Sequence, residues 1–186
     1  MIKIRHYLKE HTIIDEKYWF LQIKLPEVKP IISYYQNQIP SDCLYMGEDN
    51  NLGYELDYHI TVLYGILPLP IDDENYSVFT KCQFMLKNLK PFEIKLSDIT
   101  KFNNKPEYDV IKIDVESDRL CQIHNHCVAN LKNEETYGDY KLHVTIAYIK
   151  PNSVDYLLNQ SINKSIIINE LTLTSPEKVD YVIKLN

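Results

Sequence analysis

The chain has little glycine and no long apolar run. It holds 4 glycines in 186 residues, and no Gly/Ser-rich linker or low-complexity tract divides it, so we expect a single domain over residues 1–186. No apolar run approaches the roughly 18 to 20 residues of a membrane span. The first 20 residues carry charge throughout and lack the apolar centre of a signal peptide. We therefore expect a cytoplasmic protein with no membrane partner, located in the host cytoplasm if the protein is viral.

Cysteine and positive charge are also limited. Four cysteines without a secretion signal favour free thiols over a disulfide framework. The formal net charge of −6 argues against binding along duplex nucleic acid, which requires many cations to neutralise phosphates, but it does not exclude a small nucleotide. Ile, Lys, Asn and Tyr supply 71 of the 186 residues. Their codons are AT-rich, which is typical of an AT-rich genome such as that of a virus, a phage or some bacteria.

The apolar periodicity predicts a mixed chain of strands and helices. Helices are expected to begin at Pro30, after Asp72 or Asp73, and after Ser117 or Asp118, with a short helix at 154–158. The expected strands lie at 18–25, 58–67, 92–99, 110–115, 142–149, 166–174 and 179–185. Because strands and helices do not alternate strictly, the order predicts an α+β fold and argues against a doubly wound parallel sheet.

One six-residue pattern occurs twice, 84 residues apart. His59-Ile-Thr-Val-Leu-Tyr64 and His143-Val-Thr-Ile-Ala-Tyr148 both follow H-[IV]-T-[VI]-x-Y, and each lies in a predicted strand. Alternate strand residues share a face, so the His and Thr of each copy should point to the same side. A single copy has little weight, because strands often contain Thr and a lone strand His is usually structural. Two copies indicate two similar lobes that face one another.

This residue set suits cleavage of a phosphodiester. In-line displacement at phosphorus needs a base for the attacking oxygen and an acid for the leaving oxygen, and two histidines supply both near neutral pH. Threonine hydroxyls on the same face can donate hydrogen bonds to the non-bridging oxygens as charge develops. His59, Thr61, His143 and Thr145 are therefore the candidate catalytic residues, and the scheme needs no metal or other cofactor. Which histidine is the acid is left open.

With these two motifs the sequence resembles the two-histidine (2H) phosphoesterase superfamily, whose signature is a pair of H-h-T-h motifs, h being apolar. Both motifs match without departure, and residues 168–183 look like the family's closing hairpin. The form of the first motif through Gly65 is similar to that of bacteriophage members that degrade cyclic-oligonucleotide immune signals, the anti-CBASS proteins. The region 42–57 has no recognised counterpart.

The resemblance implies a bilobal, pseudo-symmetric fold, with two antiparallel-rich sheets facing across a central cleft and helices outside. It also implies a metal-independent phosphodiesterase acting on a small nucleotide. Within the family the substrates divide into cyclic oligonucleotides, 2′,5′-linked oligoadenylates and 2′,3′-cyclic phosphates at RNA ends. The phage-like motif and the AT-rich codon usage favour an immune signal. Two alternatives stay open, namely a non-enzymatic sponge that sequesters the nucleotide and an RNA-repair cyclic phosphodiesterase.

Four further residues are candidates for substrate binding. Lys141 precedes His143 by two residues, shares its strand parity and could neutralise phosphate; Glu170 could orient a catalytic His or a base edge. Tyr18 and Trp19 could stack against a base, although core packing explains Trp19 equally well. Each has a structural alternative, since charged residues are usually solvated and aromatic residues usually pack.

Other polar residues near the motifs are expected to be structural. Tyr64 and Tyr148, five residues after each His, should lie on the opposite strand face and pack in the core. The run Cys121-x-x-His124-x-His126-Cys127 looks like a metal cluster, but on a helix His124 joins the apolar arc while His126 points away. Lys101 and Lys105 could reach phosphate from a turn, although a solvated loop is the simpler interpretation.

Overall fold

The fold is described by a computed structural model for residues 18–69, 77–103, 105–134 and 140–186. Strands and helices are mixed along this part of the chain, and short 3₁₀ helices occur between them. The elements are β1 Trp19–Lys24, η2 Pro26–Val28, α1 Lys29–Gln36, η3 Ser41–Cys43, β2 His59–Ile66, α2 Val78–Leu86, β3 Phe92–Phe102, β4 Asp109–Glu116, α3 Asp118–Asn130, β5 His143–Ile149, η4 Asp155–Leu157, β6 Ser161–Ile168, β7 Glu170–Thr174 and β8 Asp180–Lys184.

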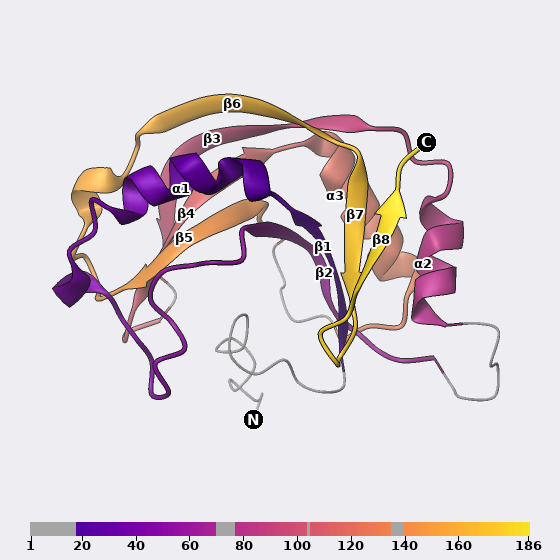
Figure 1. Ribbon diagram of the computed structural model, residues 1–186, viewed down its shortest axis with the longest axis horizontal. Helices are drawn as coiled ribbons and strands as arrows, with labels where there is room; N and C mark the ends of the chain where they lie inside the picture. The colour runs from indigo at the N-terminus through magenta and orange to yellow at the C-terminus, as the bar shows by residue number, and fades with distance from the viewer. Residues whose placement is uncertain (1–17, 70–76, 104, 135–139) are drawn as a thin grey trace.

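The strands form two four-stranded sheets. Sheet A has the order β2-β1-β7-β8 and sheet B has the order β5-β4-β3-β6. Every pairing between neighbours is antiparallel. In Figure 1, sheet B arches over one half of the molecule with α1 in front of it, and sheet A stands in the other half beside α2 and α3. The expected α+β fold with two antiparallel sheets is confirmed.

Each sheet buries its apolar face because apolar and polar residues alternate along the strands. Leu21, Ile23 and Ile60 in sheet A are at most 1% exposed, as are Ile111 and Val144 in sheet B. The helices cover the sheets crosswise. Helix α1 lies between β1 and β2 in sequence but contacts β5, whereas α3 lies between β4 and β5 and contacts β2. Each half of the fold therefore holds a helix against the motif strand of the other half.

Serine side chains cap two of the helices. The Ser117 hydroxyl accepts a hydrogen bond from the Leu120 backbone N–H at 3.3 Å, and this confirms one of the two caps expected for α3. The Ser77 hydroxyl accepts from the Thr80 backbone N–H at 3.1 Å at the start of α2. The caps expected at Asp72 or Asp73 lie outside the described residues.

The single strand expected at 166–174 was wrong. The chain forms β6 in sheet B, turns at Asn169, and then forms β7 in sheet A. Residues on both sides of Asn169 favour strands, so one polar residue does not reveal a change of sheet. Within the described ranges, no helix has the length and apolar character needed to cross a membrane.

Candidate functional site

The two motifs lie where the sheets meet. His59 is the first residue of β2 and His143 the first residue of β5, and these are edge strands of sheets A and B. The two edge strands contact each other. Both histidines are half-buried. The fold thus places the two motif strands in contact, although their motifs are 84 residues apart in sequence.

Both imidazoles are anchored in the same way. His59 Nδ1 lies 2.6 Å from the carbonyl O of Asp57, and His143 Nδ1 lies 2.7 Å from the carbonyl O of Lys141. A carbonyl oxygen only accepts, so in each neutral ring the proton must sit on Nδ1. The proton-accepting lone pair is then on Nε2. The two neutral rings therefore have the same tautomer.

The strand register defines what surrounds each motif. In sheet A, His59 is opposite Lys24 and Thr61 is opposite Gln22. In sheet B, His143 is opposite Asp114 and Thr145 is opposite Lys112. Residues directly opposite in an antiparallel pair share a face. We call these two sheet faces the motif faces; they include His59, Thr61, Gln22, Lys24 and Thr172 in sheet A, and His143, Thr145, Lys112, Asp114 and Thr100 in sheet B.

A β-bulge in each motif strand overturns the strand face expected for the two tyrosines, although Tyr148 is buried as expected. The extra residues are Val62 in β2 and Ile146 in β5, each one position after the motif Thr, and the register shifts there. The extra residue reverses the alternation that follows. Tyr148 pairs with Val110 and therefore lies on the motif face, although it is only 5% exposed. The Tyr64 ring contacts Phe20 of the motif face, with centroids 6.4 Å apart.

A chain of hydrogen bonds crosses the motif face of sheet A. Lys24 donates to one Asp180 oxygen at 2.6 Å, and Thr174 donates to the other at 2.6 Å. Burial works to raise the pKa of Asp180, but these two hydrogen bonds outweigh it and hold the pKa below its ordinary value. Because the Thr174 hydrogen goes to Asp180, the Gln22 Nε2 group, 2.9 Å away, must donate to Thr174. This fixes the orientation of the buried Gln22 amide.

Gln22 and Lys112 are the residues that sequence reasoning missed. Each lies beside a motif Thr, and they are only 1% and 4% exposed. The amide Oε1 of Gln22 has no hydrogen-bond partner in the described part of the chain. The only sequence signal for Lys112 is a charged residue between Ile111 and Ile113 in a strand, a pattern that equally fits a solvated face. Burial could not be read from it.

Two of the four expected substrate-binding residues lie near the motifs. Lys141 is exposed, and its carbonyl is the acceptor that anchors His143. Glu170 is the exposed first residue of β7. It shares strand parity with Thr172, which is opposite Gln22, so Glu170 lies on the motif face of sheet A two strands from β2.

Tyr18 and Trp19 occupy different environments. Tyr18 is 4% exposed; its hydroxyl donates to the Glu134 carboxylate, and its ring lies 6.0 Å from that of Tyr64. Trp19 is opposite Ile66 and contacts the ring of Tyr181, so it packs on the core face of sheet A. For Trp19 the contacts match the core-packing alternative, not base stacking.

The run from Cys121 to Cys127, which looked like a metal cluster in the sequence, does not gather its side chains at one point. His124 is half-buried and its Nδ1 donates to the Val62 carbonyl at 2.7 Å, whereas His126 is exposed, both as expected. No group of three or more potential metal ligands occurs among the described residues.

Lys101 on β3 has a structural role. It donates to Asp109, Asn152 and Asp155, so it connects β3 and β4 to the segment after β5.

The region without a recognised counterpart covers the outer edge of β5. The backbone N–H of Tyr148 donates to the Gly53 carbonyl at 2.7 Å, and that of Glu55 donates to the Ile146 carbonyl at 3.0 Å. The backbone N–H of Tyr45 donates to the Tyr148 carbonyl at 3.1 Å. Residues 43–55 therefore satisfy the backbone groups of a motif strand that would otherwise be left at a sheet edge.

A family model for the 2′-5′ RNA ligase superfamily matches residues 49–179, a range that includes both motifs. The chain belongs to this superfamily. It is thus a 2H phosphoesterase, a hydrolase with phosphodiesterase-type activity, and the expected family is confirmed. No curated protein matches the chain by sequence.

Solved structures share the 2H fold at low sequence identity. TT0787 of Thermus thermophilus superposes with a TM-score of 0.61 at 14% identity, covering 90% of this chain and 95% of that one. LigT of E. coli complexed with 3′-AMP gives 0.57 at 16% identity, covering 91% and 95%. Usb1 of Kluyveromyces marxianus gives 0.55 at 10% identity, covering 93% and 100%. At these identities the likeness shows the fold alone.

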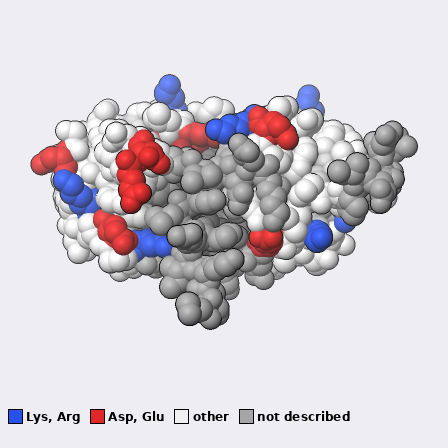
Figure 2. All heavy atoms as spheres, turned by 90° about the horizontal axis from the view of Figure 1, so that it is seen from below, with Lys and Arg blue, Asp and Glu red and all other residues white. Residues whose placement is uncertain are grey.

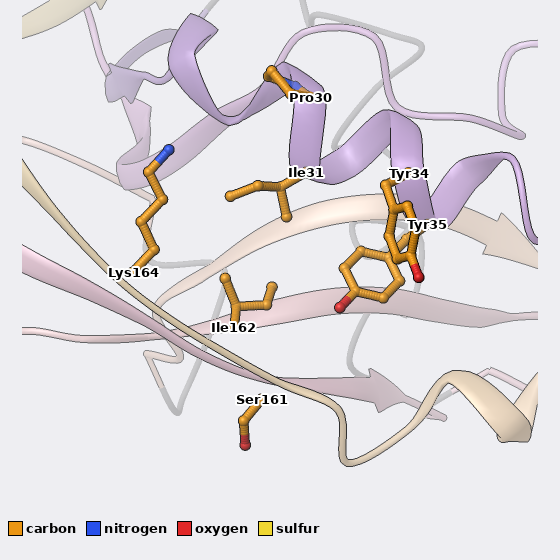
Figure 3. A pocket seen from close by; sticks show the side chains of 7 residues that line it. All are labelled: Pro30, Ile31, Tyr34, Tyr35, Ser161, Ile162 and Lys164. Carbon is orange, nitrogen blue, oxygen red and sulfur yellow. The ribbon is translucent and has the colours of Figure 1, made fainter.

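A hollow of about 420 Å³ in this 2H phosphoesterase lies away from the motifs. It is formed by α1 and β6, and Figure 3 shows Ile31 and Ile162 facing each other across it beside Tyr34 and Lys164. Lys164 is opposite the fully buried Leu96, so the hollow lies on the core side of sheet B. The motif face is on the other side of that sheet.

Charges of both signs are mixed on the surface of the 2H phosphoesterase. In the view of Figure 2, the described basic side chains are scattered and acidic side chains lie between them. The described part of this face therefore offers no continuous basic track of the kind that a long duplex requires.

Proposed function

We propose that His59 and His143 are the acid–base pair of a metal-independent phosphodiesterase that cleaves a small nucleotide, either a cyclic oligonucleotide or a 2′,5′-linked oligonucleotide. The observation that carries the proposal is the matched anchoring of the two imidazoles, at 2.6 and 2.7 Å, to the carbonyl two residues earlier. A histidine with only a packing role has no need of this repeated arrangement. It presents Nε2 as the proton-exchanging atom at both positions.

The chemistry then follows from the motif residues. One neutral imidazole takes the proton of the attacking oxygen through Nε2, and the other, protonated, gives its Nε2 proton to the leaving oxygen. Thr61 and Thr145 donate hydrogen bonds to the non-bridging oxygens, where negative charge develops. The attacking group is a ribose hydroxyl beside the scissile bond or a water molecule. The first route gives a cyclic phosphate, and the second gives a phosphomonoester.

Three considerations support a small nucleotide. LigT of E. coli, which shares the fold, has been crystallised with 3′-AMP and with NADP+. The net charge of −6 disfavours long nucleic acid. The first motif resembles that of bacteriophage enzymes that act on cyclic-oligonucleotide immune signals, which is the reason for proposing cyclic or 2′,5′-linked compounds before RNA ends.

The test is a substrate panel with EDTA present. Cyclic dinucleotides, cyclic trinucleotides, 2′,5′-linked triadenylate and 2′,3′-cyclic AMP are each incubated with the wild type, with His59→Ala and with His143→Ala, and the products are identified by mass spectrometry. We expect the wild type to cleave a cyclic oligonucleotide or the 2′,5′-linked compound, and both variants to lose the reaction. For a 3′,5′ linkage, ribo and 2′-deoxy versions of the substrate separate attack by the 2′-hydroxyl from attack by water, and for a 2′,5′ linkage the 3′-deoxy version does the same for the 3′-hydroxyl.

Other outcomes point to other functions. Cleavage of 2′,3′-cyclic AMP alone would favour the RNA-repair alternative. Tight binding of a panel member with no turnover by the wild type would favour a sponge. Near-normal turnover in either histidine variant would refute the paired role.

A further inference from the structure

Lys112 is a buried cation at the centre of sheet B. It is 4% exposed, lies on β4, and is opposite Thr100 on β3 and Thr145 on β5. An ammonium group loses its hydration when it is buried, and this is unfavourable unless partners replace the water. A lysine at this position therefore requires an explanation from its contacts.

Three groups surround the Lys112 ammonium. It donates to the Thr100 hydroxyl at 2.6 Å and to the Asp114 carboxylate. It also lies over the ring of Phe102, 4.4 Å from the centroid, which is a cation–π contact. Two of its three protons thus go to oxygen atoms, while the aromatic face covers another side. All three of these partners belong to sheet B, as Lys112 itself does.

Two of these three partners also adjoin His143. The Phe102 ring meets the His143 ring at 88° with centroids 4.9 Å apart. Asp114 is the residue directly opposite His143 across the strands. Lys112 consequently holds the aromatic ring that borders the imidazole and the carboxylate that lies beside it.

The anchoring of His143 explains why these contacts matter. Its Nδ1 bond to the Lys141 carbonyl fixes one point of the ring, and the Phe102 ring limits how far the imidazole can swing about that point. The Asp114 carboxylate is a stronger acceptor than a carbonyl and would compete for the Nδ1 hydrogen if it were not held by a cation. The equivalent position in sheet A, beside Thr61, holds the neutral Gln22.

We infer that Lys112 is a positioning residue for His143, holding Phe102 against the imidazole and keeping the Asp114 carboxylate away from Nδ1. The inference rests on the proposed function, because it gives His143 an acid–base role. The two motifs therefore differ in their surroundings. His143 is opposite an acidic residue, Asp114, whereas His59 is opposite Lys24, which forms an ion pair with Asp180. Lys112 acts through its neighbours, not by contact with the substrate.

The first test needs no turnover. Histidine is labelled with ¹⁵N, and the ring tautomers of His59 and His143 are measured by NMR in the wild type, in Lys112→Met and in the matched control Gln22→Met. We expect both rings to be in the Nδ1–H form in the wild type. Lys112→Met should change the chemical shifts of the His143 ring nitrogens, because the released Asp114 carboxylate takes the Nδ1 hydrogen bond from the Lys141 carbonyl. It should leave the His59 nitrogens unchanged, and Gln22→Met should leave His143 as it is. Unchanged His143 nitrogens in Lys112→Met would overturn the inference.

The second test uses turnover of the best substrate from the panel. Misplacement of a catalytic group by about 1 Å can cost about 100-fold, so Lys112→Met should lower kcat by about 10- to 100-fold. KM should stay nearly constant, because uniform binding is untouched. Phe102→Leu should lower kcat similarly, and the double variant should be little worse than the worse single one. An increase in KM at unchanged kcat would instead show that Lys112 binds the substrate directly and would overturn the inference.

Controls keep the inference and the proposed function distinguishable. Circular dichroism confirms folding, and if Lys112→Met does not fold, Phe102→Leu tests the same contact with the Lys112–Asp114–Thr100 cluster intact. If His143→Ala is inactive while Lys112→Met and Phe102→Leu match the wild type, the inference fails and the proposed function stands. If the wild type cleaves nothing on the panel, the proposed function fails, and the NMR result alone decides whether Lys112 positions His143.

Discussion

His124 on α3 donates its Nδ1 hydrogen to the carbonyl of Val62, 2.7 Å away, one residue after Thr61. Gln36 on α1 does the equivalent in the other half, donating to the carbonyl of Ile146, one residue after Thr145, at 2.9 Å. Val62 and Ile146 are the bulge positions of the two motif strands. Each bulge carbonyl is therefore bound by a side chain from the helix that crosses over from the other half of the fold.

We predict that His124→Phe lowers the free energy of unfolding and loosens the motif strand β2. The ring of His124 stacks on Tyr140 with centroids 3.6 Å apart, and phenylalanine keeps that stacking while it removes the donor. A buried acceptor left without a partner costs about 1 to 3 kcal/mol. Urea denaturation should show this loss in the free energy of unfolding, and turnover should fall because Thr61 sits next to the released carbonyl.

The matched control is His126→Phe on the same helix. His126 is exposed, and exposed substitutions usually change stability by no more than about 0.5 kcal/mol. If both variants lose the same free energy, the Val62 contact does not explain the effect of His124→Phe.

His59→Ala and His143→Ala should each lower turnover by about 100- to 10,000-fold, which is the usual contribution of an acid or base. Thr61→Val and Thr145→Val, which keep the shape of the side chain, should cost less, about 2 to 4 kcal/mol of transition-state stabilisation for one lost donor. Steady-state kinetics at a fixed pH measures both effects. A threonine variant that is more damaging than either histidine variant would contradict this assignment of roles.

Activity should survive chelation, because the proposed acid and base are protein groups. Dialysis against EDTA, followed by assay with and without added Zn²⁺ or Mn²⁺, checks this. A complete loss of activity that either metal restores would refute the metal-free mechanism and direct attention back to the cysteines and histidines of α3.

Stability should fall in alkaline solution. Burial raises the pKa of Cys82 and of Cys127 from 9.0 to about 12 in the folded protein. Burial also raises the pKa of Tyr140 above its ordinary 10.0. The unfolded chain then releases protons at lower pH than the folded chain does, so the stabilisation is complete below about pH 8 and is lost as the pH rises from about 9 toward 12.

Urea denaturation at pH 8 and pH 10 should therefore give a lower free energy of unfolding at the higher pH. Each group contributes at most about 1.4 kcal/mol per pH unit once it is ionised in the unfolded chain. Cys127→Ala should reduce this dependence on pH. Equal stability at the two pH values would contradict the proton release from these buried groups.

The four thiols should react in two classes. Cys82 and Cys127 are fully buried, whereas Cys43 and Cys121 are half-buried. A thiol must be both exposed and ionised to attack a disulfide reagent. Two thiols should therefore react with Ellman's reagent in the native protein near pH 8, and the other two only after denaturation. Four equal rates under native conditions would show that the buried pair is accessible.

Much of the fold could be predicted from the sequence, because local patterns specify it. The alternation around His59 and His143 predicted both motif strands, and Ser117 marked the start of α3. The pairing of the two motifs predicted two lobes that face one another, and the fold places the two motif strands in contact.

The rest depended on tertiary contacts. A bulge adds one residue without any change in composition, so the face of Tyr148 could not be read from its distance to His143. Of the partners that allow Lys112 to be buried, Asp114 lies on the same strand, whereas Thr100 and Phe102 lie on β3 and only the strand register brings them to Lys112. Asn169 looks like any polar strand residue, although the chain changes sheets there.

The placement of β7 affects how the protein is made. Sheet A combines β1 and β2 from near the beginning of the chain with β7 and β8 from its end, and β7 lies directly against β1. When β1 and β2 leave the ribosome, the hydrogen-bonding edge of β1 at Phe20, Leu21 and Gln22 has no partner until Thr172 to Thr174 have been synthesised. Sheet B, built mainly from the middle of the chain, can pair β3 with β4 and β4 with β5 earlier. Sheet A, which contains His59, therefore cannot be completed until the end of the chain has been synthesised, although its first strands are translated first.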